Sequence, residues 1–544
     1  MVGEPDRVVV RMYRGVLGDC FLITVWQRGT PRVAMIDCGV LQNVQPGPDM
    51  VAGLSSAVVA SIGEDALAKV EGTRDAVRSI EADIVAYLAD KGGKLDLLVI
   101  THDHYDHVAG FTLPDDENVF MQPSLTIEKL WLSWVENPTD DQARALAARF
   151  AKSKEAVALA AEVGRHAVGP LSDALEQVQA LAAFIGPVAH PGLPAVPSKT
   201  KTTTQSIQAM REKVGANTRF LEPGQVIAPE DGIGLKVYVL APPRAEKRLF
   251  KDLPTGKGES YEVYLTSVDD AAAVAGVALT QLHGMALAGA AAMEDSQRGA
   301  VEDEEMLDPL PFARPHARPY PPKADQAREP KVDGWDDLRE AYEGEANAYR
   351  SISNDWTEAA DTLALKLDSD TINSSLVLAF ELPDGRVLLF PGDAQVGNWE
   401  SWGDQLYPPT AAAGEPQQTI DDILRRVVFY KVGHHASHNA TARARGLELM
   451  TDPRLCAAIP VVEAVAKVQG PGKKTPGKGW KMPFQHLYAR LEEKTEGRIV
   501  QGDGDPAREA AAFAAKDAGV TVRHADALTG GRWVELTFPL EPSS

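Results

Sequence analysis

Apolar residues fall into short runs at the start of the chain, and turn-forming residues separate these runs. RVVVRMYRG, CFLITVWQ and RVAMIDCGV, all within residues 7–40, are rich in β-branched and aromatic residues and predict three strands. Residues 79–88 have a helical period, and KLDLLVI (94–100) is a continuous apolar run typical of a fully buried strand. The alternation of strand, helix and strand predicts the α/β class.

The pattern then changes character twice. Residues 140–187 are alanine-rich with helical spacing, and strand signals return at GLKVYVLAPP (234–243). A second stretch, from about 247 to 363, combines an alanine-rich helical pattern with an acidic run and a proline-rich run. Proline-rich composition of this kind is typical of a linker or an exposed loop. We therefore expect a strand-rich core that is interrupted twice.

Two predicted strands near the end of the core lead into polar residues. INSSLVLAFELPDGRVLLFPGDA (372–394) predicts a hairpin with Asp384 and Gly385 at its turn. RVVFYKVGHHASH (426–438) predicts another strand, which ends in histidines.

The segment Ala271–Met293 has the length of a membrane span, but it consists mostly of alanine and glycine and carries Gln281 and His283 near its middle. We expect a helix that is soluble or faces a partner, and no stable membrane association. No apolar leader is visible at the start of the chain. Only three cysteines occur, and they are far apart, which argues against a disulfide framework. A cytoplasmic location is expected.

The charge balance limits the partners. With 77 acidic and 55 basic residues the net charge is −22, so broad coating by nucleic acid is disfavoured. One basic loop, KVQGPGKKTPGKGWK (467–481), could bind phosphates locally, or it could be a solvated surface loop.

Histidines crowd one short stretch. LDLLVITHDHYDHVAGF (95–111) places three histidines and two aspartates within six positions, directly after the buried strand, although the chain has only 12 histidines. Imidazole and carboxylate ligands together suit zinc, iron or manganese. The alternative is a polar surface loop, but His-x-His-x-Asp-His is a highly specific pattern.

With this motif, the chain resembles the metallo-β-lactamase-fold hydrolase superfamily. MIDCGV resembles its early Asp-x-Gly signature, LLFPGDA the strand that ends in a metal-bridging aspartate, and KVGHHASH the late histidine motif. LGDCFLI, VLAPP, NSSLVL, PGDA and VGHHAS are more narrowly similar to the hydrolase domains of bacterial competence DNA-uptake channel proteins and their soluble relatives. The resemblance covers residues 7–111, 234–243 and 370 to about 503, and Ala436 stands where glycine is usual.

The resemblance implies an α/β fold, an αββα sandwich, here with two large, mainly helical insertions. The expected division is a first half of the core (1–112), a helical insertion (113–233), a core strand (234–246), a helical, acidic and proline-rich insertion (247–363), and a second half of the core with a C-terminal extension (364–544). The two insertions could also be surfaces for protein partners.

The resemblance also implies a pair of divalent cations, zinc or manganese. His102 and His104 would hold one ion, and Asp106 and His107 the other, with Asp393 bridging them.

For the late ligand we prefer His435 to His434, because the histidine directly before Ala/Gly-Ser aligns with the ligand of related nucleases. His434 then becomes a proton donor or a group that supports the ligands. Asp37 would lie beneath the site and orient a ligand histidine; the alternative is a turn residue that caps a strand end.

One ligand of the superfamily has no obvious counterpart. A third histidine usually completes the first ion, and the candidates do not end strands: His166, His190, His283 and His316. Asn373 could lie near this gap. The residues after the late motif could contact substrate or form a solvated loop: His438, Asn439 and Thr441.

Two cations about 3.5–4 Å apart lower the pKa of a water between them and clamp an in-line displacement at phosphorus. Asp106, Asp393 and His434 are the expected catalytic residues, with Asp393 accepting the proton of the nucleophile. The expectation is a phosphodiesterase acting on a nucleic-acid strand or a nucleotide-derived molecule. A hydrolase of esters, lactones or thioesters remains an alternative, as does a partner-binding regulatory protein with a weakened metal site.

Overall fold

The computed structural model describes the chain outside one long segment and several short ones. The described residues are 6–166, 173–194, 199–251, 355–408, 417–437, 439, 441–470, 476–477, 479–515, 519–525 and 532–540. The segment Ala271–Met293, the acidic and proline-rich runs, His283, His316 and His438 lie outside them.

The strands form two large sheets and one small pair. The eight-stranded sheet has the order β16 (Thr521–His524), β17 (Trp533–Pro539), β1 (Arg7–Tyr13), β2 (Phe21–Gln27), β3 (Thr30–Ile36), β5 (Leu97–Val99), β7 (Leu130–Ser133) and β8 (Thr218–Leu221). The seven-stranded sheet has the order β15 (Ile499–Gln501), β14 (Cys456–Ile459), β13 (Val427–Lys431), β12 (Val387–Phe390), β11 (Val377–Glu381), β10 (Lys236–Ala241) and β9 (Val226–Ile227). β4 (Lys94–Leu95) pairs with β6 (Thr126–Ile127).

Each sheet is antiparallel in one part and parallel in the other. β17, β1, β2 and β3 pair antiparallel, with Arg7 opposite Pro539, whereas β3, β5, β7 and β8 are parallel. In the other sheet, β12, β13, β14 and β15 are parallel. Parallel strands end at the same edge of a sheet, so each sheet has one edge where several carboxyl ends gather.

The two large sheets face each other across a hydrophobic core. One buried cluster contains side chains from both sheets, among them Ile23 of β2 and Phe390 of β12. The rings of Phe21 and Phe390 meet edge to face with their centroids 5.6 Å apart. The inward residues of β2 alternate with residues that face the helices, as expected for a strand covered on both sides.

Helices cover the outer face of each sheet. On the eight-stranded sheet, α4 places Val77, Ile80 and Ile84 at helical spacing against Met35 and Leu98. On the seven-stranded sheet, members of α13, α14 and α16 share one buried cluster with the outward residues of β10 to β15. The helices are α1 (Gly47–Ala52), α2 (Ser56–Ile62), α3 (Glu64–Ala68), α4 (Thr73–Ala89), α5 (Tyr105–Val108), α6 (Asp141–His166), α7 (Asp173–Ile185), α8 (Thr203–Val214), α9 (Glu246–Leu249), α12 (Asp355–Ile372), α13 (Val396–Trp402), α14 (Ile420–Leu424), α15 (Glu463–Lys467), α16 (Gln485–Thr495) and α17 (Pro506–Ala514).

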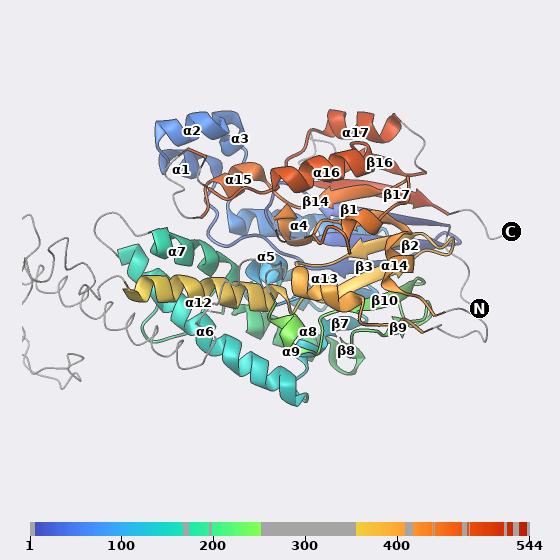
Figure 1. The fold of residues 1–544 in the computed structure, drawn as a ribbon, viewed down its shortest axis with the longest axis horizontal. Helices are drawn as coiled ribbons and strands as arrows, with labels where there is room; N and C mark the ends of the chain where they lie inside the picture. Colours follow the sequence, from blue (N-terminus) through green and yellow to red (C-terminus); the bar gives the residue numbers. More distant parts are fainter. Residues whose placement is uncertain are drawn as a thin grey trace, which may run out of the picture.

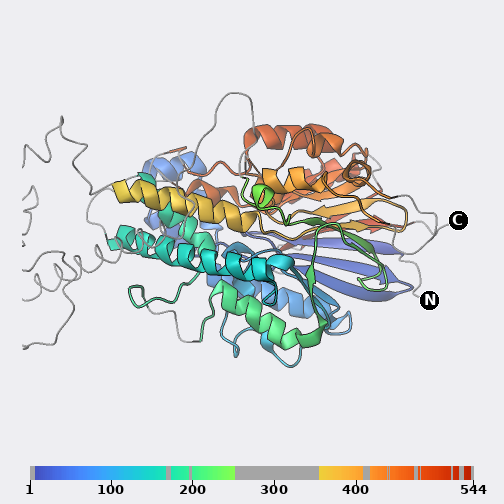
Figure 2. The same cartoon turned by 60° about the horizontal axis from the view of Figure 1, so that its bottom comes forward.

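Three long helices extend from one end of the sheets. In Figure 1, α6, α7 and α12 run side by side to the left of the strands, and Figure 2 keeps them together in the turned view. All three contact one another, and buried residues such as Val157, Leu181 and Leu367 belong to one cluster. Helices from both predicted insertions are therefore packed together.

The first predicted insertion, expected to be mainly helical, is not separate from the core. Residues 113–233 contain α6, α7 and α8, but they also contribute β7 and β8 to the eight-stranded sheet and β9 to the seven-stranded sheet. The strands were missed because β7 has only four residues, all of them buried, and a buried run so short has no period. Thus this segment is part of the core.

The strand pairing confirms the predicted hairpin. β11 and β12 form the predicted hairpin, with Gly385 in the left-handed region at φ 84° and Oδ1 of Asp384 accepting from the Arg386 N–H.

The three cysteines, Cys20, Cys38 and Cys456, are free and buried. Within the described part of the chain, every helix is too short or too polar to cross a bilayer.

Candidate metal centre

The predicted site residues follow strands, at the sheet edges where the carboxyl ends of several parallel strands meet. Asp37 follows β3 and His102 follows β5 in the eight-stranded sheet, whereas Asp393 follows β12 and His435 follows β13 in the other sheet. Residues from the two halves of the chain are therefore brought to one place by the sheet topology.

A glycine allows three of these segments to approach closely. A Cβ atom on Gly39 would lie 1.6 Å from the carbonyl oxygen of Asp106, so only glycine fits there. The Gly39 N–H donates to the carbonyl of Asp19 over 2.8 Å, and the Asp19 N–H donates to the carbonyl of Asp106 over 2.9 Å. The early Asp-x-Gly signature thus has a packing reason: it presses the loop with Asp19 against α5.

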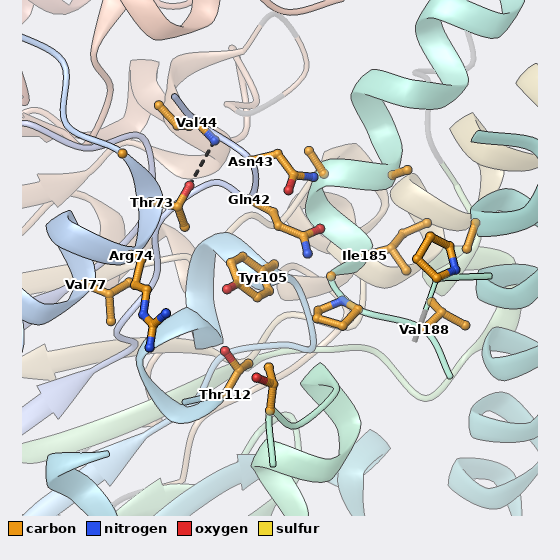
Figure 3. A pocket seen from close by; sticks show the side chains of 18 of the residues that line it. Gln42, Asn43, Val44, Thr73, Arg74, Val77, Tyr105, Thr112, Ile185 and Val188 are labelled. Atoms are coloured by element: carbon orange, nitrogen blue, oxygen red, sulfur yellow. Dashed lines mark hydrogen bonds between the residues drawn. The ribbon is translucent and has the colours of Figure 1, made fainter. Parts of the chain in front are cut away.

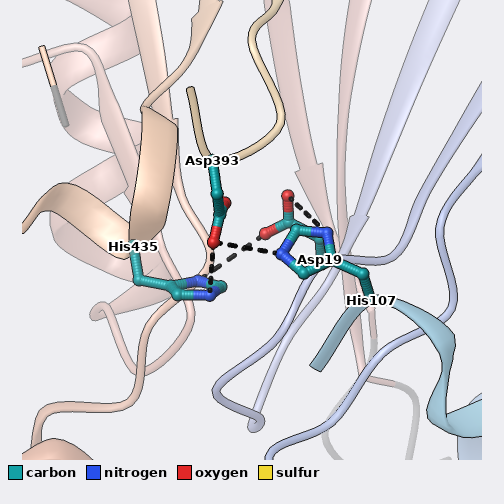
Figure 4. Close-up of side chains that lie close together, drawn as sticks. All are labelled: Asp19, His107, Asp393 and His435. Carbon is teal, nitrogen blue, oxygen red and sulfur yellow. Dashed lines mark ion pairs between the residues drawn. The ribbon is translucent and has the colours of Figure 1, made fainter. Parts of the chain in front are cut away.

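Four buried side chains form the centre of the site. The donor atoms of Asp19, His107, Asp393 and His435 all lie within 4.8 Å of one another (Figure 4). Nε2 of His107 is 3.2 Å and Nε2 of His435 is 3.7 Å from Oδ2 of Asp393. Among the described residues, neither this oxygen nor Nε2 of His107 has a hydrogen-bond partner. An imidazole nitrogen and a carboxylate oxygen that face each other without partners, beside a second imidazole, could hold a metal ion.

One carboxylate oxygen of Asp393 faces the centre, and the other accepts hydrogen bonds that fix the side chain. Its Oδ1 accepts hydrogen bonds from Nζ of Lys431 and from the backbone N–H of His434, both over 3.1 Å. Burial alone would raise the pKa of this carboxyl, but the charges of His107 and Lys431 outweigh it and hold the pKa well below its usual range. Asp393 is therefore a carboxylate, with Oδ2 left for a ligand.

Sequence reasoning missed Lys431 and Asp19. Lys431 is the last residue of β13, and its ammonium group is held by Oδ2 of Asp19, Oδ1 of Asp393 and the carbonyl of Gly392, the last over 2.7 Å. Burial would lower the pKa of Lys431, but the two carboxylates raise it above its ordinary value. The available signal was a lysine at the end of an apolar strand, directly before the late histidine motif.

Asp37 lies beneath the site, as the orienting role predicted for it requires. Its Oδ2 is 2.8 Å from Nδ1 of His107, and its two oxygens accept the N–H and the hydroxyl of Thr101 over 2.8 and 2.7 Å. This contact keeps a proton on Nδ1 and turns Nε2 of His107 toward Asp393. Burial would lower the pKa of His107, but Asp393, Asp19 and Asp37 raise it well above its usual value.

The rest of the early motif surrounds this centre. Oδ2 of Asp106 is 2.7 Å from Nε2 of His435, while Oδ1 of Asp106 has no hydrogen-bond partner among the described residues. The ring of His102 lies 4.1 Å from that of His107 and 4.8 Å from that of His104, centroid to centroid. Nε2 of His102 is buried and also lacks a partner among the described residues. Burial lowers the pKa of His104 to about 4, so its ring is neutral.

The late motif is a strained turn. His434, His435 and Ala436 have φ values of 42°, 49° and 61°, which is the left-handed region that non-glycine residues rarely adopt. This turn points the His434 N–H at Asp393 and directs the ring of His435 into the centre, where its Nδ1 faces the carbonyl of Pro460 at 3.0 Å. Of the two candidate ligands, the structure therefore places His435 among the facing donors.

The side chain of His434 takes another direction. Its Nδ1 is 2.8 Å from the hydroxyl of Ser437, which in turn donates to Oδ1 of Asn439 over 2.9 Å. Burial lowers the pKa of His434 to about 4. A neutral ring at pH 7 cannot act as the predicted proton donor until the negative charge of a bound substrate raises its pKa.

The structure gives Asn373 other partners. Its Nδ2 donates to the carbonyl of Lys251 over 3.3 Å, and its Oδ1 accepts from Asn398 over 3.2 Å, so the amide joins the end of α12 to the segment after α9 and to α13. His190 pairs with Glu155 at 2.9 Å on the surface of α6. The side chain of His166 is outside the described part of the chain.

A cavity of about 890 Å³ lies beside the early motif. Tyr105, between two predicted ligands, lines it together with Thr73, Arg74 and Ile185 (Figure 3). The ring of Phe184, the neighbour of Ile185 on α7, lies 5.8 Å from that of His104. The end of α7 therefore forms a wall between this cavity and the metal centre.

The donor set fits a divalent cation in number and type. Buried imidazoles and carboxylates converge from both sheets, and several of their atoms have no partner within the described residues. Comparisons of the chain with models of protein families, with curated proteins and with solved structures gave no match.

Proposed function

We propose that this protein is a two-metal hydrolase of the metallo-β-lactamase superfamily, with an αββα core, and that it cleaves phosphodiesters. The observation that carries the proposal is the convergence of Asp19, His107, Asp393 and His435. These residues come from distant parts of the chain, yet each follows a strand or lies in a loop that the His-x-His-x-Asp-His resemblance marks. Two facing sheets with helices on their outer faces support the same assignment.

In this proposal the ligands divide into two groups around Asp393. His102 and His104 would hold the first ion; Asp106, His107 and His435 would hold the second. Oδ2 of Asp393 faces the second group and would serve both ions. Bound there, divalent cations would activate water as a nucleophile and neutralise the charge that develops on a phosphodiester.

Neighbouring side chains hold the proposed ligands in position. Asp37 holds His107 through Nδ1, and Lys431 holds Asp393 through Oδ1, so neither ligand needs to reorient. The ammonium group of Lys431 also offsets part of the negative charge of three buried aspartates, Asp19, Asp106 and Asp393. The ring of His434, which is held by Ser437 and neutral at pH 7, would accept a proton from a group bound next to it.

The choice of phosphodiesters rests on the motifs shared with DNA-uptake hydrolase domains. Folds of this kind host several hydrolytic reactions, so the site chemistry alone leaves esters, lactones and thioesters as competitors. The net charge of −22 favours a small substrate or a nucleic-acid strand bound locally.

A screen of the full chain tests the proposal. The protein is stripped with a chelator, reloaded with Zn²⁺ or Mn²⁺, and assayed on bis-p-nitrophenyl phosphate, single-stranded DNA, RNA, a lactone and a thioester. We expect phosphodiester turnover that Asp393→Asn abolishes and that Asp384→Asn, at the far end of the same strand, leaves intact. Turnover that survives Asp393→Asn, or turnover of the lactone or thioester alone, would overturn the proposal.

A further inference from the structure

A second cavity lies on the side of the molecule that carries α15 and α16. It has a volume of about 640 Å³, and its lining includes one lysine and four aromatic rings, those of Lys481, Trp480, Phe484, His486 and Tyr488. Lys481 and His486 are exposed, and the other three side chains are partly exposed. Aromatic rings that stay open to solvent at a concave surface are typical of a binding site. We call this cavity the aromatic pocket.

The aromatic pocket is connected to both histidine motifs. The ring of Trp480 stacks on that of Phe184, with the centroids 5.3 Å apart and the planes 20° apart, and the ring of Phe184 lies 5.8 Å from that of His104. On the other side, the N–H of Phe484 donates to the carbonyl of Ala436, in the late histidine turn, over 2.8 Å. A molecule held in the aromatic pocket therefore lies next to the metal centre.

The charges around the aromatic pocket favour an anionic ligand. The run 467–481 contains five lysines and no acidic residue, although the chain as a whole has a net charge of −22. Lys481, at the end of this run, has no ion pair among the described residues. Two carboxylates also line the pocket, but Glu463 pairs with Lys467 and Glu492 pairs with Arg508, both over 2.8 Å. The charge that remains for a ligand is that of Lys481.

Aromatic rings beside a lysine suit one class of ligand. Every nucleobase has a π face that stacks on an aromatic side chain whatever the sequence, and a lysine attracts the phosphates that link the bases. A duplex hides the faces of its bases, so only a strand with unpaired bases can use the rings. An acidic peptide would pair with Lys481 but would leave the rings unused.

We propose that the aromatic pocket binds unpaired nucleobases of a single-stranded nucleic acid, either DNA or RNA, and brings a neighbouring phosphodiester of the same strand to the metal centre. The second half of this inference rests on the proposed function, whereas the binding of the strand does not. Trp480 and His486 supply stacking faces, and Lys481 contacts a phosphate. The aromatic pocket thereby selects unpaired strands over duplexes.

Binding to the full chain in the presence of a chelator tests the proposal, because the strand then stays intact. Fluorescence anisotropy over a series of salt concentrations measures the affinity for labelled oligothymidylate and oligouridylate of about 12 nucleotides, for a hairpin duplex and for polyglutamate. The variants are Trp480→Ala, Trp480→Phe, His486→Ala and Lys481→Gln. The matched controls are Trp26→Ala, a partly exposed tryptophan at the end of β2 remote from the metal centre, and Lys247→Gln, an exposed lysine on α9, across the sheets from α16 (Figure 1). Circular dichroism checks that each variant folds.

We expect the parent and the controls to bind the single strands more tightly than the hairpin or polyglutamate. Trp480→Ala and His486→Ala should each weaken this binding about fivefold or more, and Trp480→Phe should keep most of it, since phenylalanine retains a stacking face. Lys481→Gln should reduce the slope of log affinity against log salt by about 0.7.

Two results would overturn the assignment while leaving the proposed function intact. One is parent-like affinity in Trp480→Ala, or in His486→Ala if the tryptophan variant does not fold. The other is equal binding of single strand, hairpin and polyglutamate by the parent. Single-strand binding that depends on Trp480, in a protein that shows no metal-dependent turnover, would instead support the aromatic pocket and refute the proposed function.

Discussion

Replacing Lys431 by methionine is the most informative single perturbation of the centre. The side chain of Lys431 is 1% exposed, and it holds the carboxylates of Asp19 and Asp393, which are 3% and 1% exposed. Methionine fills a similar volume but leaves two buried carboxylates without their cation. Oδ1 of Asp19 already has no hydrogen-bond partner within the described residues, so it cannot compensate.

The expected loss of stability is large because the ion pairs of Lys431 are shielded from water. Removing one partner of a buried ion pair costs about 3–5 kcal/mol, whereas an exposed pair is worth about 1 kcal/mol or less. For a chain of this size such a loss lowers Tm by about 3–5 °C. The matched control is Lys467→Met, because Lys467 pairs with Glu463 at 2.8 Å with both side chains more than 40% exposed. Its Tm should change by no more than about 1 °C.

Thermal unfolding in a chelator, followed by tryptophan fluorescence and circular dichroism, measures the effect on the metal-free protein. The decrease in Tm relative to the parent should be smaller at pH 5 than at pH 8. Burial raises the pKa of Asp19 even in the parent, and loss of the opposing charge of Lys431 raises it further above the unfolded value, so the variant loses stability as the pH rises through that window. A Tm within about 2 °C of the parent at pH 8 would refute the view that this ammonium group compensates the buried carboxylates.

Two further substitutions test other features. Glu81, 2% exposed on α4, has its pKa raised by burial to about 8. Its protonated form is favoured in the folded state, so the parent should lose about 1.4 kcal/mol per pH unit between about pH 4.5 and 8, a loss that Glu81→Gln removes. Urea unfolding at pH 5 and pH 8 checks this, and equal pH dependence of the two proteins would contradict it. Ala436→Gly should stabilise the protein by about 1 kcal/mol, because Ala436 adopts a φ of 61°. A Tm lower than that of the parent would argue against strain in the late turn.

Local patterns allowed the sequence to predict the early motif and the hairpin. His102, His104, Asp106 and His107 lie within six positions of the chain, so their proximity follows from chain connectivity alone. The hairpin at Asp384 likewise depends on turn residues and flanking strands that are neighbours in sequence. Such contacts need no knowledge of the rest of the fold.

The residues that sequence reasoning missed depend on packing between distant segments. Lys431, at the end of β13, pairs with Asp19, in the loop before β2 of the other sheet, and nothing near either residue in the sequence indicates the other. Trp480 lies in a run whose composition indicates only a basic loop. Its contact with Phe184 depends on how that run packs against α7. A single sequence does not carry this information.

Helices from both interruptions of the core lie beside the early histidine motif. Nζ of Lys154 on α6 donates to Oδ2 of Asp103 over 2.6 Å, within the early motif, and Phe184 on α7 lies against His104. α12, at the end of the second interruption, brings Asp368 to the same histidine from the other side. The sheets position the ligands that face the centre, while these helices enclose the side at which His104 lies. Under the proposed function, metal preference and substrate should therefore depend on α6, α7 and α12, since these helices supply the neighbours of His104 that the core strands do not.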